Sequence, residues 1–466
     1  MKNLEKCHSH YDVLIIGGGI VGCGILRDLA LNLAENESNA RVLLVEKGDF
    51  CSQTSQGSSK MLHGGIRYLE NFDFSLISEA LHEKNLWLKL TPHLCYEEKF
   101  FLPVYGSSKY PLPFIKIGLM MYDMLSGFKN TKHSAMFKGE TLKTFPEMEP
   151  KHLRGAGIYY DGIVEDAKLG LECLYDALEE KQATALNYVE VLECEKKNSH
   201  YRVLLHDRIT DKKKEITTTQ VIFATGPFTD GLMKKLKLQW EPQLVPSKGI
   251  HLWLKKEDIT LPHPVVLQTE DNRVIFVIPE RDAILAGTTE TLVDEEIFDI
   301  KANETEINYL LAEVKRYFPN SKLGHNSIID SIAAVRPLVK DSHSSKPGKV
   351  SRHHKIFQPY KNLFIIMGGK YTTFRVMAQQ ITKTIMNNLG LSYHYQLTLN
   401  SLRSPSKQLP FSKQNIDANM IKDIIKNEHV RTIDDLWQRR LSQISKNHPT
   451  INLNFQEIEK IFKNGN

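Results

Sequence analysis

Short apolar runs alternate along the chain with longer segments in which apolar and polar residues recur at helical spacing. Residues 13–16 form a β-branched, apolar run, and residues 20–34 have the apolar spacing of a buried helix. A second apolar run follows at 42–45. This strand–helix–strand order predicts a parallel βαβ unit near the N-terminus. The stretch 242–289 contains three further runs of strand composition, which predict a second sheet.

A glycine-rich turn joins the first predicted strand to the first predicted helix. Gly17, Gly19 and Gly22 have the spacing G-x-G-x-x-G. The first glycine permits the tight turn, the second lets a pyrophosphate approach the backbone, and the third lets the helix pack on the strand. Glu46 ends the second predicted strand, where an acid can hold the ribose hydroxyls of an adenosine. The set predicts a dinucleotide site, with a glycine-rich turn of an unrelated α/β protein as the alternative.

The loop after Glu46 favours a flavin over a nicotinamide cofactor. Residues 47–65 are rich in hydroxyl-bearing and small side chains, whereas nicotinamide enzymes usually continue directly with strands and helices. Shielding an isoalloxazine ring requires such an excursion. A later strand ends in Ala-Thr-Gly at Gly226, an element that commonly returns to the adenine half of FAD. We therefore expect FAD, with a βα turn without a ligand as the alternative for residues 221–232.

Composition narrows the class of protein further. Of 466 residues, 41% are apolar and 25% are charged, which is ordinary for a soluble globular protein. Six scattered cysteines without a C-x-x-C pair argue against a zinc site or disulfides, so we expect no metal and a reducing compartment. The sequence has no apolar run of membrane-spanning length and no signal-peptide pattern at its N-terminus. The net charge of +5 slightly favours anionic partners, and no nucleic-acid module is evident.

A series of motifs between residues 11 and 378 resembles, in the same order, the FAD-dependent glycerol-3-phosphate dehydrogenases. They include IGGGIVGCG, SSKMLHGGIRYLE, ATGPF, SKGIHLWL, AAVRPLV and GGKYTTFRVMA. The resemblance implies a flavoprotein that oxidises sn-glycerol 3-phosphate to dihydroxyacetone phosphate by hydride transfer to FAD N5. It also implies a glutathione-reductase/amino-acid-oxidase-like α/β fold, in which a Rossmann-like FAD-binding domain carries an inserted α+β substrate domain.

The chain departs from the family pattern at several positions. Leu26 and the pair Asn32 and Leu33 replace an alanine and an Arg-Gly pair of the first helix. We expect them to be tolerated, because they lie at the end of the helix away from the ligand. Phe374 replaces a tyrosine and so removes one hydroxyl.

The resemblance also implies a division of the chain. We expect the FAD-binding domain to comprise residues 1–100, 160–240 and 330–398. The substrate domain would take residues 100–160 and 240–330. Residues 399–466 begin with a Ser/Pro/Lys-rich linker and resemble a shortened C-terminal helical cap.

The resemblance places the substrate phosphate beside several cations. Arg67 and Tyr68 match the family's phosphate-binding pair, and Lys370 and Arg352 match further positions at the substrate. A phosphate dianion favours a planar guanidinium and a hydroxyl donor, and its burial requires more than one cation. The alternative for Arg67 is a surface pair with Glu70 at i,i+3 spacing.

The same resemblance implies a set of residues around the flavin. Two glycines at the start of the last predicted helix can direct its N-terminus at the electron-rich edge of the flavin. The predicted cofactor contacts in this half of the site are Ser58, Ser59, His63, Gly64, Gly368, Gly369, Lys370 and Thr372.

Two residues are candidates for handling the substrate hydroxyl. His251 matches the family's active-site histidine, and a histidine that titrates near neutrality is a natural general base. The resemblance places Arg336 near the same hydroxyl, but a guanidinium is too weak an acid to act readily as a base. We therefore expect Arg336 to orient the alcohol and His251 to accept its proton, with a structurally packed strand histidine as the alternative.

Reoxidation of the flavin divides the family into quinone-linked dehydrogenases and oxygen-using oxidases. The chain shows no sizeable insertion before its C-terminal part, which favours a quinone. We expect a cytoplasmic enzyme, peripheral on the inner face of the membrane, and leave a homodimer open. Residues 111–128 are amphipathic and could enter a membrane interface or pack in the substrate domain. An oxidase acting on this or another small anion, and a flavin-binding protein without turnover, are the alternative functions.

Overall fold

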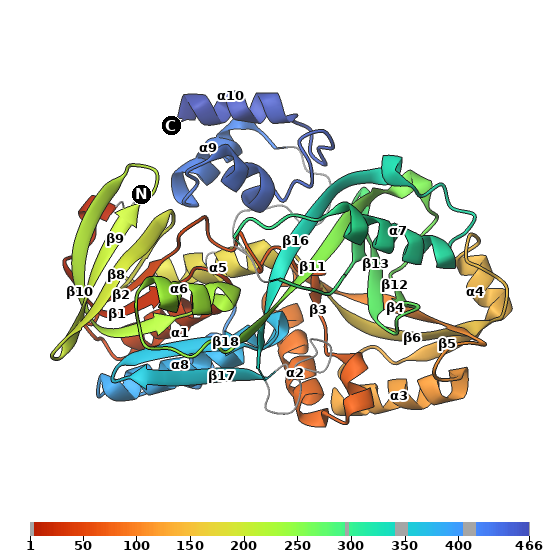
Figure 1. Ribbon diagram of the computed structural model, residues 1–466, viewed down its shortest axis with the longest axis horizontal. Coiled ribbons are helices and arrows are strands. Elements are labelled where there is room, and N and C mark those ends of the chain that lie inside the picture. Colours follow the sequence, from red (N-terminus) through yellow and green to blue (C-terminus); the bar gives the residue numbers. More distant parts are fainter. Residues whose placement is uncertain (1–3, 294–297, 341–352, 404–415, 466) are drawn as a thin grey trace.

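Two large sheets lie beside each other in the computed structural model, which describes residues 4–293, 298–340, 353–403 and 416–465 (Figure 1). The first sheet follows the order β17-β18-β10-β1-β2-β7, and β8 and β9 extend it from β10. Its strands are β1 His10–Ile16, β2 Val42–Val45, β7 Ala183–Leu186, β8 Val189–Lys197, β9 His200–Asp207, β10 Lys212–Phe223, β17 His354–Tyr360 and β18 Leu363–Gly368.

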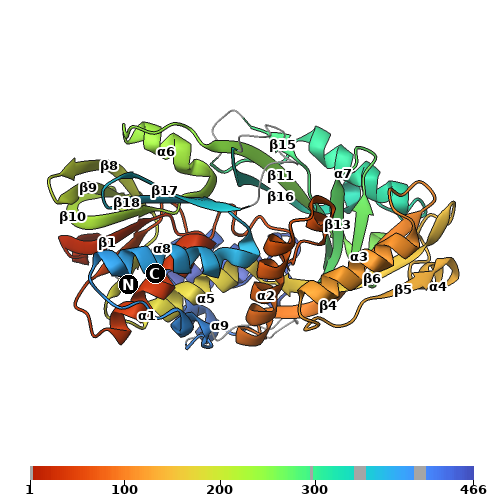
Figure 2. The same cartoon turned by 90° about the horizontal axis from the view of Figure 1, so that it is seen from below.

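The centre of the first sheet is parallel and covered by helices. β1 pairs in parallel with β2 and β10, and β10 pairs in parallel with β18. Helices α1 (Ile20–Glu35), α5 (Asp166–Leu178) and α8 (Phe374–Asn388) lie along one face, and α6 (Thr229–Lys235) lies on the other (Figure 2). Burial on both faces explains why β2 and the second half of β1, Val13–Ile16, are continuously apolar. The predicted βαβ unit is confirmed.

The second sheet is built mainly from antiparallel strands of the middle of the chain. Its order is β15-β11-β14-β13-β12-β4-β6-β3, with β16 paired to β11 and β5 paired to β6. The strands are β3 Met61–Leu62, β4 Cys95–Tyr105, β5 Ser134–Phe137, β6 Leu153–Val164, β11 Leu244–Lys255, β12 Val265–Gln268, β13 Val274–Glu280, β14 Ala283–Gly287, β15 Thr291–Leu292 and β16 Ile328–Val339.

Helices cover both faces of this second sheet. Helices α2 (Phe74–Leu90) and α3 (Leu112–Leu125) pack on one face, and α7 (Glu304–Tyr317) packs on the other (Figures 1 and 2). Adjacent residues of β4 serve the two faces, because successive strand side chains point to opposite sides: Phe100 packs with the α2 and α3 residues, and Phe101 packs with those of α7. Helix α4 (Lys138–Thr144) lies at the outer end.

The C-terminal residues form a small helical unit above the first sheet (Figure 1). It contains α9 (Ala418–Asn427), a π-helical turn at Asp435–Arg440 and α10 (Phe455–Gly465). Its own core includes Ile421, Trp437 and Ile458, all buried. Residues 416–465 are called the C-terminal unit.

The two sheets do not follow the predicted ranges throughout. β3 and β16 belong to the second sheet, although β3 and all but the start of β16 fall in the ranges assigned to the FAD-binding domain. The division into FAD-binding, substrate and cap domains stays a prediction. Within the described residues, no helix has the length and apolarity needed to cross a membrane.

Candidate active site

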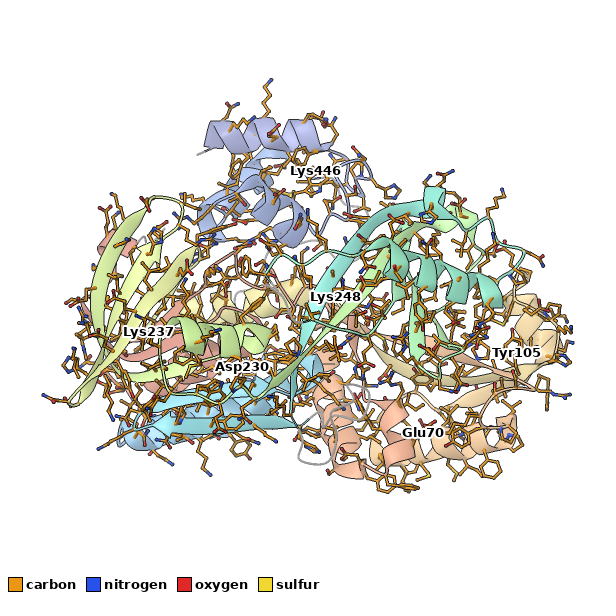
Figure 3. The ribbon with its side chains drawn as sticks, in the orientation of Figure 1. Glu70, Tyr105, Asp230, Lys237, Lys248 and Lys446 are labelled. Carbon is orange, nitrogen blue, oxygen red and sulfur yellow. The ribbon has the colours of Figure 1, made fainter. Side chains whose placement is uncertain are left out.

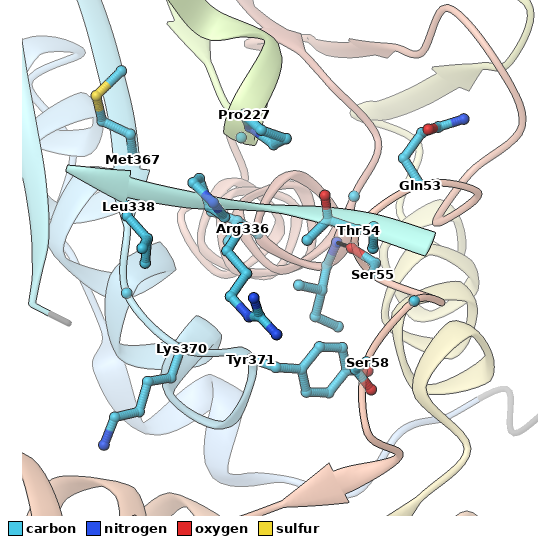
Figure 4. A pocket seen from close by; sticks show the side chains of 18 of the residues that line it. Gln53, Thr54, Ser55, Ser58, Pro227, Arg336, Leu338, Met367, Lys370 and Tyr371 are labelled. Carbon is cyan, nitrogen blue, oxygen red and sulfur yellow. Dashed lines mark hydrogen bonds between the residues drawn. The ribbon is translucent and has the colours of Figure 1, made fainter. Parts of the chain in front are cut away.

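A cavity of about 880 Å³ extends from the glycine turn of the first sheet to the inner side of the second sheet. It brings together most of the predicted site residues, although they lie far apart in the sequence. Those that line it are Gly17, Gly19, Glu46, Ser58, Ser59, His63, Arg67, Tyr68, Gly226, His251, Arg336, Gly368, Gly369 and Lys370. In Figure 4, Arg336 points into this cavity from β16, and Lys370 and Tyr371 come from the turn before α8.

The glycine turn between β1 and α1 leaves space at the cavity wall. Gly17 has φ of +108°, which a side chain would strain, and a Cβ there would lie 2.5 Å from the carbonyl oxygen of Ala224. A Cβ at Gly22 would lie 1.9 Å from the carbonyl oxygen of Gly17. Gly22 does not line the cavity; its role is to let α1 approach the turn. The turn therefore presents bare backbone and the N-terminus of α1 to the cavity.

Glu46 fastens the same turn from the end of β2. One carboxylate oxygen accepts a hydrogen bond from the Gly18 amide at 2.7 Å, and the other accepts one from the Gly48 amide at 2.8 Å. Burial raises the pKa of Glu46, and these two amides act in the opposite direction. The carboxylate that the sequence predicts for a ribose therefore also holds the backbone around Gly18.

The segment after β3 folds into a tight turn before a 3₁₀ helix at Ile66–Asn71. Gly64 donates its amide proton to Asp161 at 3.1 Å, and a Cβ on Gly64 would lie 2.3 Å from both Leu81 and Tyr122. Gly64 therefore packs behind the cavity wall, and Gly65, with φ of +84°, faces the cavity.

Arg67 and Tyr68, two of the phosphate-binding candidates, lie directly after this turn, and Lys370 approaches them from the turn before α8. The Lys370 ammonium lies 4.1 Å from the centroid of the Tyr68 ring, and Arg67 is exposed at the mouth of the cavity. Glu70 pairs with Lys109 at 2.7 Å, at the lower edge of Figure 3, where Glu70 is labelled. Among the described residues, no ion pair joins Arg67 to Glu70, so that alternative is not what the structure contains.

Arg336 is fixed by neighbouring strands. Its guanidinium donates to the Thr288 hydroxyl at 2.7 Å, to the Thr289 carbonyl at 3.1 Å and to the Ser247 hydroxyl at 3.4 Å. A Cβ on Gly249 of β11 would lie 2.2 Å from the same guanidinium. The absence of a side chain at that position allows Arg336 to lie flat across β11.

His251 lies on β11 with its imidazole over Gly287 of β14. Its Nε2 is hydrogen-bonded to the Ser59 hydroxyl at 2.8 Å, and the residue is 3% exposed. Burial, followed by the positive charges of Arg336 and Lys60, lowers the pKa of His251 to about 3. The imidazole is therefore neutral at pH 7 and resists protonation as long as no anion lies beside it.

Several polar residues at or beside the cavity were not among the predicted site residues. Lys60 pairs with the buried Asp166, which also accepts a hydrogen bond from Ser58 at 2.7 Å. Arg273 also lines the cavity and is held by Asp271 at the turn before β13. Lys60 belongs to the SSK motif, but its partner Asp166 lies 106 positions away in the sequence.

Besides Gly22 and Gly64, two further predicted contacts are indirect or lie outside the described residues. Thr372 does not line the cavity; its hydroxyl donates to the His63 carbonyl at 3.2 Å and so joins α8's N-terminal turn to the substrate side. Arg352 lies outside the described residues. Within the described residues, no cluster of His, Cys, Asp and Glu has a geometry that could hold a metal ion.

The cavity fits a dinucleotide with a ring system. The bare glycine turn and the α1 N-terminus suit a pyrophosphate, and Gly368 and Gly369, with φ of +78° and +79°, expose backbone at the far end. A Cβ at Gly17 would lie 2.5 Å from the Ala224 carbonyl oxygen, and a Cβ at Gly369 would lie 2.5 Å from the Met377 sulfur, so both positions require glycine.

The match to known proteins covers most of the chain. Residues 12–383 match the family described as FAD dependent oxidoreductase. The mitochondrial glycerol-3-phosphate dehydrogenase of Schizosaccharomyces pombe is 34% identical over 83% of this chain and 63% of its own length. The aerobic glycerol-3-phosphate dehydrogenase of Bacillus subtilis is 31% identical over 81% of this chain and 67% of its own length.

A solved structure extends the match to three dimensions. The glycerol-3-phosphate dehydrogenase from Bacillus halodurans complexed with FAD has a TM-score of 0.67 and 26% identity, over 85% of this chain and 68% of that one. The predicted fold class and cofactor are confirmed at the level of the family. The chain spans only 52 to 63% of the first mitochondrial relatives' length. The chain belongs to the FAD-dependent oxidoreductase family and, within it, to the FAD-dependent glycerol-3-phosphate dehydrogenases.

Proposed function

We propose that this protein oxidises sn-glycerol 3-phosphate to dihydroxyacetone phosphate. The observation that carries the proposal is the grouping of Arg67, Lys370 and Arg336 around one end of a cavity whose other end is a glycine turn. Arg67 and Lys370 suit a phosphate dianion and Arg336 suits the developing alkoxide, whereas an uncharged substrate would leave the first two cations unmatched. When bound, FAD supplies the hydride acceptor for the substrate carbon.

In this proposal Arg67, Tyr68 and Lys370 bind the phosphate. The Lys370 ammonium and the Tyr68 ring already contact each other, so the two groups are positioned before the substrate arrives. Arg67 is exposed and can move toward the phosphate at the cavity mouth. Arg352 would join them as the sequence predicts, although it lies outside the described residues.

Arg336 and His251 manage the reacting hydroxyl. Arg336 is held by three hydrogen bonds and so presents a fixed positive charge that stabilises a developing alkoxide. His251 is neutral and can accept the hydroxyl proton. Its pKa is low partly because Arg336 and Lys60 are positive. A bound dianion offsets that charge, so we expect the basicity of His251 to rise when the substrate binds.

The test is a reduction in the absence of oxygen. Purified protein with FAD bound is mixed with sn-glycerol 3-phosphate, and the visible band of the oxidised flavin is followed. We expect rapid bleaching that plain glycerol does not cause and that Arg67→Ala slows at least tenfold at subsaturating substrate, since one charge-assisted phosphate contact contributes about 1.5–3 kcal/mol. A flavin that stays oxidised with this substrate contradicts the proposal.

We further propose a quinone as electron acceptor and a peripheral position on the cytoplasmic face of the membrane. Helix α3 supports this proposal, because Phe114, Ile117, Met120 and Met124 are 51 to 63% exposed at spacings that share one helix face. Exposed basic side chains at Lys116, Lys129 and Lys132 suit anionic lipid headgroups.

The alternative acceptor is oxygen. An oxidase would give hydrogen peroxide in proportion to the substrate consumed in air, and a dehydrogenase would give little until a quinone analogue is added. A flavin-binding protein without turnover would bind FAD and fail both assays.

A further inference from the structure

We propose that the C-terminal unit retains the cofactor. In this proposal it fastens the loop 49–55, which forms one wall of the FAD cavity, so that docking of the unit and binding of FAD stabilise each other. The proposal rests on FAD as the family cofactor and not on the identity of the substrate. It gives a role in cofactor binding to residues that make no contact with the cavity themselves.

Two adjacent arginines of the unit converge on one buried carboxylate of the loop. Arg439 Nε donates to Asp49 at 2.5 Å, and Arg440 donates to both oxygens of Asp49, at 3.1 Å to Oδ1. Asp435 accepts a second bond from Arg439 at 2.9 Å, so the buried charges balance. All four side chains are at most 5% exposed. Because buried ions are costly without their partners, this cluster holds only while the unit is docked.

A contact between two aromatic rings also connects the C-terminal unit, through the loop, to the glycine turn. His429 of the unit lies edge-on to Phe50, with ring centroids 5.8 Å apart. Phe50 is fully buried against the turn, where a Cβ on Gly18 would lie 2.6 Å from its ring. The next residue, Cys51, donates its amide proton to the Gly18 carbonyl at 2.9 Å. The loop at 49–51 therefore lies between the C-terminal unit and the turn that the sequence predicts for the pyrophosphate.

The rest of the loop forms the cavity wall. Asp49 and residues 51–55 line the cavity. The Ser55 hydroxyl accepts a hydrogen bond from the Ile20 amide at 2.9 Å, at the first turn of α1. Arg439 also reaches Gln56 just beyond the loop, at 3.4 Å. If the unit undocked, Asp49 would lose its buried partners and would be more stable in water than inside the protein. The loop 49–55 would then become less ordered, so FAD should bind less tightly to the undocked chain.

The experiment compares two arginines of the same unit. Arg440→Gln breaks the contact with the loop. Arg431→Gln is the matched control, because the Arg431 guanidinium donates to Asp207 and to the Asn187 carbonyl, each at 3.1 Å, and neither residue lines the cavity. In contrast to Arg440, it makes no hydrogen bond with Asp49 among the described residues. The affinity of each full-length apoprotein for FAD is measured by quenching of flavin fluorescence. We expect Arg440→Gln to weaken FAD binding at least tenfold and Arg431→Gln to change it less than threefold.

A measurement on the unaltered protein keeps the test independent of whether a variant folds. Amide hydrogen exchange is compared with and without FAD. Since coupling is reciprocal, FAD should slow exchange in α9 and in residues 435–440, and leave α4 at the far end unchanged. Equal exchange in α9 with and without FAD, or equal loss of affinity in both arginine variants, overturns the proposal.

Discussion

At the scale of single residues, the unusual property of the site is a buried histidine that stays neutral. In the unfolded chain a histidine takes up a proton near pH 6.5, but in the folded protein His251 does so only near pH 3. Between these values the unfolded state binds more protons, so acidification destabilises the fold and raising the pH restores it. When the pH falls from 7.5 to 5, the free energy of unfolding of the unaltered apoprotein should therefore fall by about 2 kcal/mol more than that of His251→Gln.

The measurement is urea unfolding of the apoproteins at several pH values. His82→Gln is the matched control, because His82 is an exposed histidine of α2. Its stability should follow the pH dependence of the unaltered protein. A parallel pH dependence for His251→Gln would mean that the imidazole is protonated in the fold as readily as in the unfolded chain.

The sequence motifs predicted which residues lie near the cavity, whereas the properties of each side chain depend on neighbours from other segments. The sequence predicts Ser59 at the flavin; in the structure Ser59 lines the cavity and is also hydrogen-bonded to His251, 192 positions away. The neutral state of His251 depends on burial and on two cations from other segments, Arg336 and Lys60. A single sequence contains these residues but not their distances, so their gathering at one cavity could be predicted and the charges around His251 could not.

At the scale of elements, the pairing of β11 with β16 positions Arg336. The two strands are antiparallel, with Ser247 opposite Arg336 and Gly249 opposite Ala334. A methyl group at Gly249 would lie 2.2 Å from the Arg336 guanidinium and 2.5 Å from the Thr288 hydroxyl. We expect Gly249→Ala to displace Arg336 and to slow reduction of the flavin by sn-glycerol 3-phosphate on the order of 100-fold. FAD affinity should change less than about threefold, because the glycine turn is untouched.

The matched control for this substitution is Gly139→Ala in α4, where an added Cβ meets nothing within 4 Å. Stopped-flow reduction and FAD titration of both variants separate the two effects. Normal reduction by the Gly249→Ala enzyme would show that the position of Arg336 does not matter to the reaction.

Elements made by neighbouring residues were the easiest to predict. The unit of β1, α1 and β2 follows from two apolar runs, a helical pattern and a glycine turn, all within the first 45 residues. The place of β3 and β16 in the second sheet could not be predicted, because strand pairing is non-local. β16 pairs with β11, where Leu254 lies opposite Ile328 and Leu244 opposite Val339, partners 74 to 95 residues apart, and its own sequence does not specify that choice.

At the scale of the whole molecule, the cavity depends on three regions of the chain at once. The first sheet supplies the glycine turn, and the second sheet supplies His251 and Arg336. The C-terminal unit contacts the loop 49–55, which lines the cavity, through Asp49. The C-terminal unit also reaches the second sheet, since Arg281 donates to the Ser442 carbonyl at 2.6 Å. The cap was predictable as helical from its pattern, but its contact with Asp49 was not, because that contact joins residues 390 positions apart.

The proposed membrane surface is a property of the whole molecule, because α3 lies at the outer edge of the second half, away from the first sheet (Figure 1). The double variant Phe114→Glu with Ile117→Glu should bind vesicles of anionic lipid about 100-fold less tightly, since burying each side chain contributes about 1.5–3 kcal/mol.

Flavin reduction by substrate should be unchanged in this variant, because α3's exposed face does not line the cavity. The control is Ile209→Glu, an exposed apolar residue in the turn between β9 and β10 at the opposite end of the molecule. Vesicle sedimentation measures binding, and turnover with a bilayer-dissolved quinone should fall in parallel. Equal vesicle binding by the two variants would remove α3 from the proposal, and unchanged turnover with that quinone would mean that electron delivery does not require this face.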